Sequence, residues 1–172
     1  MIGRAPRSTD RCGEAEPAVR VDCTGMHIVL GSDHAGLHLK DLLGGHLTEG
    51  GHEVVDLGTH DESAVDYPDF AAAVGRAVVA GDADFGVCVC GTGMGIAIAA
   101  NKIHGVRAAV VHDVTSARLA VEHNNANVVC FGAWLIGSVV ATNALDAFLG
   151  SSFAGGRHIP RIEKITRLEE SQ

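Results

Sequence analysis

Residues 85–102 read FGVCVCGTGMGIAIAANK, an apolar run that passes through a glycine-rich loop into a second apolar run. The first part, FGVCVC, is short and almost continuously apolar, which is typical of a parallel strand buried on both faces. Glycine then recurs at every second position, and the following segment is a candidate helix. The stretch therefore predicts a strand, a tight loop and a helix in direct succession, the unit from which parallel α/β sheets are built.

The same alternation of short apolar runs and longer amphipathic stretches continues on both sides of this segment. It predicts strands at 27–31, 53–57, 85–90, 106–111 and 127–131. It predicts helices at 36–49, 68–80, 94–102, 114–123 and 137–149, then a last short helix with Pro160 in its first turn. Five βα units in series predict an α/β fold: a doubly wound, Rossmann-like, five-stranded parallel sheet with helices on both faces, a three-layer sandwich.

Two local signals support the expected helices. Asp113, with two hydroxyl residues close behind it, is typical of a helix start. Within 36–49, four leucines recur at spacings of three and four and are expected to form one buried stripe: Leu39, Leu42, Leu43 and Leu47.

The chain has 172 residues and a formal net charge of -8. Residues 1–25 contain four arginines and four acidic residues and show no hydrophobic period, so we expect a disordered N-terminal extension. Translation from Met26 is the alternative. Residues 26–172 are expected to form a single domain that carries the whole negative charge. Such a body argues against nucleic acid as a partner, since phosphate-backbone binding needs basic stripes.

Membrane insertion and secretion are not expected. No apolar run reaches the roughly 18 residues that a membrane helix needs, and the N-terminal segment has no apolar stretch of the signal-peptide kind. The five cysteines are odd in number and form no CxxC pair, which favours a reducing, cytoplasmic setting. His34 and His38 lie four apart, but no third metal ligand is evident.

Ligands of doubly wound sheets bind beyond the carboxyl ends of the strands, near a switch in strand order. Cys90 closes the strand 85–90, and the glycine loop behind it can turn its N–H groups inward to hold an anion or an oxyanion. Such a field favours the thiolate of Cys90 as base or nucleophile. Because Ile96 replaces the third glycine of GxGxxG and no Lys-Ser or Lys-Thr follows, the loop is not a nucleotide motif. The alternative is that Cys90 is a buried cysteine before a structural turn. A structural role is expected for Cys88, which lies inside the strand.

Three further clusters carry polar groups, each with a structural alternative. Asp33 stands at a strand end, where it contacts a ligand or caps the next helix. His123 is a proton donor or part of a helix C-cap. Arg157 and Arg161 lie four apart and form a phosphate clamp or a solvated helix start. Together with the thiol and the anion cradle, they suggest proton transfer next to a carbonyl in a sugar phosphate.

At these residues the sequence resembles the ribose-5-phosphate isomerase B and galactose-6-phosphate isomerase family. The resemblance spans residues 26 to about 165 and implies an aldose–ketose isomerase that interconverts ribose 5-phosphate and ribulose 5-phosphate through an enediolate. The alternatives are a six-carbon substrate, such as galactose 6-phosphate or allose 6-phosphate, and a non-catalytic sugar-phosphate-binding module. The matching stretches are GSDHAG (31–36), LK (39–40), DLGT (56–59), VDYPDFA (65–71), CGTGMGIAIAANKIHGVRAA (90–109), EHNNANV (122–128), FLGSSFAGGRH (148–158) and Arg161.

The resemblance also implies residue roles. Cys90 matches the catalytic base, Thr92 a hydroxyl that assists proton movement, and His123 the residue that opens the sugar ring. The residues that match substrate-binding positions are Asp33, His34, Tyr67, Gly91, Gly93, Met94, Gly95, Asn124, Arg157 and Arg161, with the backbone of 91–95 as the anion hole. The family's homodimers, or dimers of dimers, share active sites between subunits, and no metal or cofactor is implied.

Two groups of the family differ in their base. Some members place a glutamate base where Ile96 stands, so Cys90 together with Ile96 indicates the cysteine-base group. The chain departs from the family pattern at two places. Trp134 follows Phe-Gly-Ala where members often carry arginine, which leaves the preference between five- and six-carbon substrates open. The extension before Met26 is the second departure.

Overall fold

The structure is a computed structural model that describes residues 25–170. Its sheet contains β1 (His27–Ser32), β2 (Glu53–Asp56), β3 (Phe85–Cys90), β4 (Ala108–Val110) and β5 (Val128–Gly132). The strand order is β2-β1-β3-β5-β4, and all four pairings are parallel, which confirms the predicted fold class. The chain changes direction across the sheet between β1 and β3, so the switch point lies between the carboxyl ends of these two strands.

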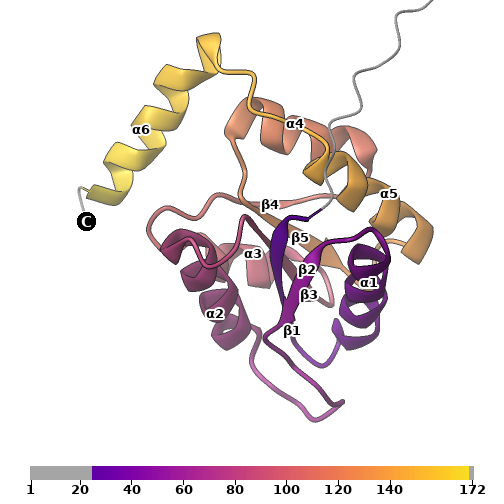
Figure 1. The fold of residues 1–172 in the computed structure, drawn as a ribbon. Helices are drawn as coiled ribbons and strands as arrows, with labels where there is room; N and C mark the ends of the chain where they lie inside the picture. The colour runs from indigo at the N-terminus through magenta and orange to yellow at the C-terminus, as the bar shows by residue number, and fades with distance from the viewer. Residues whose placement is uncertain (1–24, 171–172) are drawn as a thin grey trace, which may run out of the picture.

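Helices cover both faces of the sheet, as expected (Figure 1). One face packs against α1 (Leu37–Glu49), α4 (Val114–Asn124) and α5 (Ser138–Leu149), and the other packs against α2 (Tyr67–Ala80) and α3 (Met94–Ala100). A short 3-10 helix, η1 (Gly156–His158), leads into α6 (Ile159–Glu170), which has twelve residues, no buried side chain and Pro160 near its start. The predicted N-terminal extension, apart from Gly25, lies outside the described residues.

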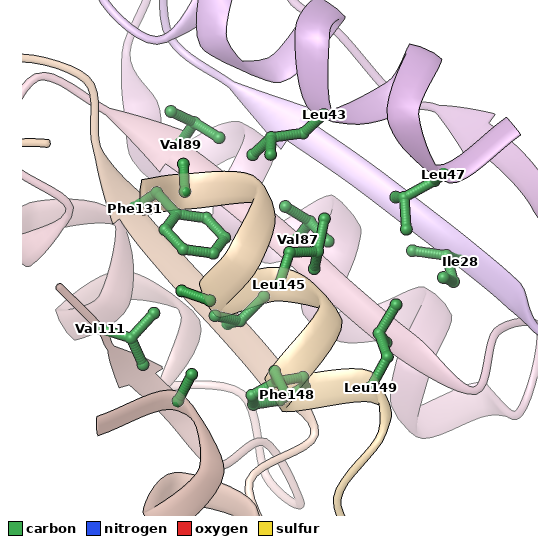
Figure 2. Close-up of a cluster of buried hydrophobic side chains, with 14 of the residues drawn as sticks. Ile28, Leu43, Leu47, Val87, Val89, Val111, Phe131, Leu145, Phe148 and Leu149 are labelled. Atoms are coloured by element: carbon green, nitrogen blue, oxygen red, sulfur yellow. The ribbon is translucent and has the colours of Figure 1, made fainter. Parts of the chain in front are cut away.

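Both cysteines of β3 lie on the same side of the sheet. Side chains alternate along a strand, so Val87 and Val89 enter the larger cluster with α1, α4 and α5, which Figure 2 shows. Cys88 and Cys90 point to the opposite side and pack with α2 and α3. The chemistry expected at Cys90 therefore lies on the α2 and α3 side of the sheet.

Some local expectations need correction. Leu42 is exposed, because the buried stripe of α1 follows the four-residue spacing of Leu39, Leu43 and Leu47 and leaves Leu42 at its margin. The strand expected at 106–111 narrows to β4, because the Arg107 N–H donates to the Asn127 side chain rather than to a strand. The helix start at Asp113 is confirmed: its carboxylate accepts the Ser116 N–H in a capping box.

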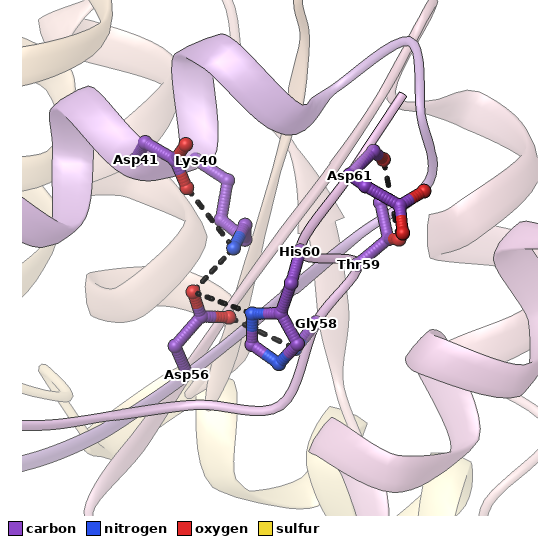
Figure 3. Close-up of polar contacts among 7 residues, drawn as sticks. All are labelled: Lys40, Asp41, Asp56, Gly58, Thr59, His60 and Asp61. Carbon is purple, nitrogen blue, oxygen red and sulfur yellow. Dashed lines mark hydrogen bonds and ion pairs between the residues drawn. The ribbon is translucent and has the colours of Figure 1, made fainter. Parts of the chain in front are cut away.

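A buried lysine fixes the loop after β2 to the carboxyl edge of the sheet (Figure 3). The side chain of Lys40 is 1% exposed, and its ammonium pairs with Asp56 and, at 3.1 Å, with Asp41. The second oxygen of Asp56 accepts the Gly58 N–H at 2.9 Å. Gly58 in turn accepts the Ser32 N–H at the end of β1. The matching stretches 39–40 and 56–59 are thus two sides of one contact.

We predict an asymmetry when this pair is broken. Asp56→Ala leaves a buried ammonium with only Asp41, and we expect it to lower the free energy of unfolding by about 2–3 kcal/mol. Lys40→Met should cost less, because the carboxylate of Asp56 is 38% exposed and can be hydrated. Urea denaturation measures both, with His60→Ala as the control for a weak, exposed neighbour of Asp56. A larger loss for Lys40→Met would contradict this account.

Candidate active site

The thiol of Cys90 meets the backbone of the glycine loop. Cys90 is the last residue of β3 and is 4% exposed, and its sulfur accepts the Gly93 N–H at 3.1 Å. The chain turns at Gly93, whose φ of 76° lies in the left-handed region that favours glycine. The Met94 N–H points to Thr92 Oγ1 at 3.4 Å. The sulfur of Cys90 thus faces the backbone N–H groups of the loop.

The loop keeps this shape because it packs backbone against backbone on the end of β5. A Cβ atom added at Gly93 would lie 2.9 Å from the carbonyl carbon of Phe131. One added at Gly132 would lie 2.6 Å from the carbonyl of Thr92. The Ala133 N–H donates to the Cys90 carbonyl at 2.9 Å. Sequence reasoning places Gly132 at a strand end but does not predict this packing, because its partner Thr92 lies in a loop that is distant in sequence.

The other predicted residues at this edge lie around the loop. Asp33 follows β1, and its Oδ1 accepts the Gly36 N–H at 2.9 Å. This bond closes a turn before α1 and is no helix cap, because Gly36 is itself the N-cap and no side chain caps the helix. It also reaches the neighbouring strand, since its N–H donates to the Val89 carbonyl at 3.3 Å. His34 is exposed, and its Nδ1 accepts the Val65 N–H at 3.3 Å. Both residues thus border the switch point beside Cys90.

Tyr67 lies over the helix end of the loop. It is the first residue of α2, and a Cβ added at Gly95 would lie 2.8 Å from its Cζ. Its side chain is partly exposed, so the phenol borders solvent as well as the loop. We call residues 90–95 together with Asp33, His34 and Tyr67 the cysteine-loop group.

The other four predicted residues lie elsewhere in the chain. His123 and Asn124 end α4, and the chain then enters β5 at Val128, which lies beside Gly86 at the amino end of β3. Cys90 is four residues further along β3, or about 13 Å. Arg157 and Arg161 follow in η1 and α6. We call this second set the histidine–arginine group. It therefore does not meet the cysteine-loop group within one chain.

His158 connects the histidine–arginine group. The rings of His123 and His158 stack with centroids 4.3 Å apart and an interplanar angle of 14°. Arg157 Nε donates to His158 Nε2 at 3.3 Å. Burial, followed by the nearby His123, Arg157 and Arg161, lowers the pKa of His158. A neutral His158 can accept the hydrogen bond from Arg157. The stacking of His123 on His158 has no signal in the sequence.

The remaining thiols differ from Cys90. The hydrogen bond with Cys88 and complete burial raise the pKa of Cys130, so this thiol stays protonated. Cys88 lies inside β3 and is fully buried, as expected. Of the three cysteines that the structure describes, only Cys90 reaches the loop at the carboxyl edge.

Two absences hold for the described part of the chain. Residues 25–170 contain no cluster of three or more side chains that could hold a metal ion. His38 pairs with Glu62 at 3.2 Å, whereas His34 contacts Val65, so these histidines have different partners. None of the helices within this range is long and apolar enough to cross a membrane.

A parallel α/β sheet with a cysteine and a glycine-rich loop at its switch point defines a protein of the Rossmann-like α/β class. Residues 28–165 match the family model described as Ribose/Galactose Isomerase, and the chain belongs to this family. It is 46% identical to ribose-5-phosphate isomerase B of Escherichia coli strain K12, over 83% of this chain and 96% of that protein.

Solved structures agree with this assignment. Ribose-5-phosphate isomerase B of Clostridium thermocellum superposes with a TM-score of 0.84 at 45% identity, covering 85% of this chain and 99% of that chain. The enzyme of Mycoplasma genitalium, solved with bound ribulose-5-phosphate, superposes with a TM-score of 0.82 at 42% identity, covering 87% and 99%. The family resemblance drawn from the motifs is confirmed.

We predict that the cradle does not tolerate a methyl group at Gly93. Gly93→Ala combines a left-handed φ with a clash against the Phe131 backbone, so we expect a loss of about 3 kcal/mol in unfolding free energy. Gly137→Ala is the control, because a Cβ added at Gly137 meets no atom within 4 Å. Chemical denaturation of both variants tests this. Equal stabilities would show that the loop is free to move away from β5.

Proposed function

We propose that this protein is an aldose–ketose isomerase that interconverts ribose 5-phosphate and ribulose 5-phosphate, with Cys90 as the base. The observation that carries the proposal is the hydrogen bond from the Gly93 N–H to Cys90 Sγ at the switch point. It places the one edge thiol of the described chain beside backbone donors that can stabilise an oxyanion. Membership of the ribose/galactose isomerase family and the named relatives support the same reaction.

The proposed chemistry moves one proton between two carbons. The thiolate of Cys90 removes the C2 proton of the open-chain aldose, and the electron pair forms a C1=C2 double bond while O1 takes up negative charge. The N–H groups of 91–95 stabilise this enediolate. Thr92 accepts the Met94 N–H and keeps its own hydrogen free, so it can carry a proton between O2 and O1. Return of the proton from sulfur to C1 completes the ketose.

We propose that the histidine–arginine group of a second copy completes each site. Arg157 and Arg161 would hold the phosphate, Asn124 would contact the sugar, and His123 would open the ring by giving a proton to the ring oxygen. The separation of the two groups within one chain supports this arrangement. So does α6, which has no buried side chain and stands apart from the sheet in Figure 1. The assembly would be a homodimer or a dimer of dimers.

The substrate's length is the open part of the proposal. A six-carbon sugar phosphate is the second candidate, because the family's description names both ribose and galactose isomerases. Comparison of kcat/KM on ribose 5-phosphate and on allose 6-phosphate or galactose 6-phosphate separates the two candidates. Binding without turnover would instead identify a non-catalytic binding module.

The free thiols of the described chain support a reducing, cytoplasmic setting. Residues 26–172 are proposed to act as one domain.

Removal of the thiol tests the base. We expect Cys90→Ala to lower kcat roughly 10²–10⁴-fold in a coupled isomerase assay, because proton abstraction loses its acceptor. Cys88→Ala is the matched control, since it removes a thiol from the same strand and face without touching the loop. Full activity in Cys90→Ala would remove this residue from the mechanism.

Mixing two defective variants tests the shared site. Cys90→Ala and the double variant Arg157→Ala/Arg161→Ala should each be nearly inactive at low substrate concentration. Co-expressed in equal amounts, they should recover roughly a quarter of wild-type activity, because half of the dimers are mixed and each mixed dimer contains one intact site. A site built within one chain would show no recovery. Size-exclusion chromatography of both variants controls for assembly.

A further inference from the structure

The one tryptophan and the one tyrosine of the chain lie at opposite ends of the glycine loop. Tyr67 covers Gly95, as described above. At the strand end, a Cβ added at Gly91 would lie 2.7 Å from Cζ3 of Trp134. The anion cradle is therefore bracketed by two aromatic rings that come from different segments of the chain.

Trp134 is held in place by its backbone while most of its ring remains exposed. Its N–H donates to the Gly91 carbonyl at 2.9 Å, in register with the bond from Ala133 to Cys90. The residue is nevertheless 73% exposed, and within the described residues its indole N–H has no hydrogen-bond partner. A large amphipathic ring in this state offers both an apolar face and a free donor to a ligand.

The same ring borders a second space. A groove of about 410 Å³ is lined by Trp134 together with residues of α1, of the β5–α5 loop and of the start of α5. Neither Cys90 nor Gly91 lines that groove. Because Trp134 touches the cradle at Gly91 and also lines the groove, its indole stands between the two spaces.

We propose that Trp134 is a specificity-determining wall of the substrate site, an inference that rests on the proposed isomerase function. The indole packs against the carbon chain of the open sugar phosphate in the cradle and closes the way into the groove. A longer chain needs volume beside the cradle, and Trp134 occupies it. The wall therefore favours five-carbon over six-carbon substrates. A neutral ring adds no positive charge, which leaves the phosphate to Arg157 and Arg161.

The ratio of kcat/KM for allose 6-phosphate to that for ribose 5-phosphate tests the wall. Trp134→Ala joins the cradle to the groove, and we expect the ratio to rise about tenfold, the size of effect that one carbon has in a closed pocket. Trp134→Phe keeps a ring and should keep the wild-type ratio. Val139→Ala is the control, because Val139 is apolar, 70% exposed and on α5, outside the groove lining. An unchanged ratio in Trp134→Ala overturns the proposal.

Fluorescence gives an independent readout, because Trp134 is the only tryptophan. In the Cys90→Ala variant, whose turnover is expected to be slow, ribose 5-phosphate should shift the emission in a saturable way. Inorganic phosphate should not, because it lacks the carbon chain. No shift with the sugar phosphate, or the same shift with inorganic phosphate, overturns the contact with the carbon chain.

The outcomes separate this inference from the proposed function. A wild-type protein that turns over neither sugar phosphate refutes the isomerase, whatever Trp134 does. An active wild type with an unchanged ratio and silent fluorescence refutes only the wall. If Trp134→Ala loses activity equally on both substrates and dissociates on size-exclusion chromatography, Trp134 belongs to a subunit contact and the wall is wrong.

Discussion

The site depends on a direct contact between two backbones. The loop after β3 and the end of β5 approach so closely that neither Gly93 nor Gly132 has room for a Cβ. This contact holds the Gly93 N–H at the sulfur of Cys90 and brings Trp134 against Gly91. Because interiors are close-packed, a methyl group at either glycine would move the whole cradle. Gly93 and Gly132 are needed here because they have no Cβ atom.

Strand order is the second constraint. β5 lies between β3 and β4, so the residues after β5 meet the loop after β3 although another βα unit separates them in sequence. The Lys40–Asp56 pair acts similarly on the other side of the switch point: it joins α1 to the end of β2, and the Gly58 that Asp56 holds accepts the Ser32 N–H at the end of β1. The site is thus bordered by the segments that follow β1, β2, β3 and β5.

The sequence predicts the parts of this arrangement that are local. Continuous apolar runs indicate buried parallel strands, and the succession of 85–90, the glycine loop and 94–102 locates the thiol and its donors. Contacts that depend on the order of strands have no local signal, such as the ring of Trp134 over Gly91 and the stack of His123 on His158. Leu42 shows a finer limit, since spacing alone does not separate the centre of a helix face from its margin.

The exposed helix α6 has a consequence for the regulation of the proposed enzyme. If the arginines that hold the phosphate reach the thiol only on another chain, catalytic capacity depends on the concentration of protein as well as on its folding. Dilution would then silence the enzyme while every subunit keeps its fold. Newly made chains would stay inactive until they meet, so assembly itself would act as the switch that starts turnover.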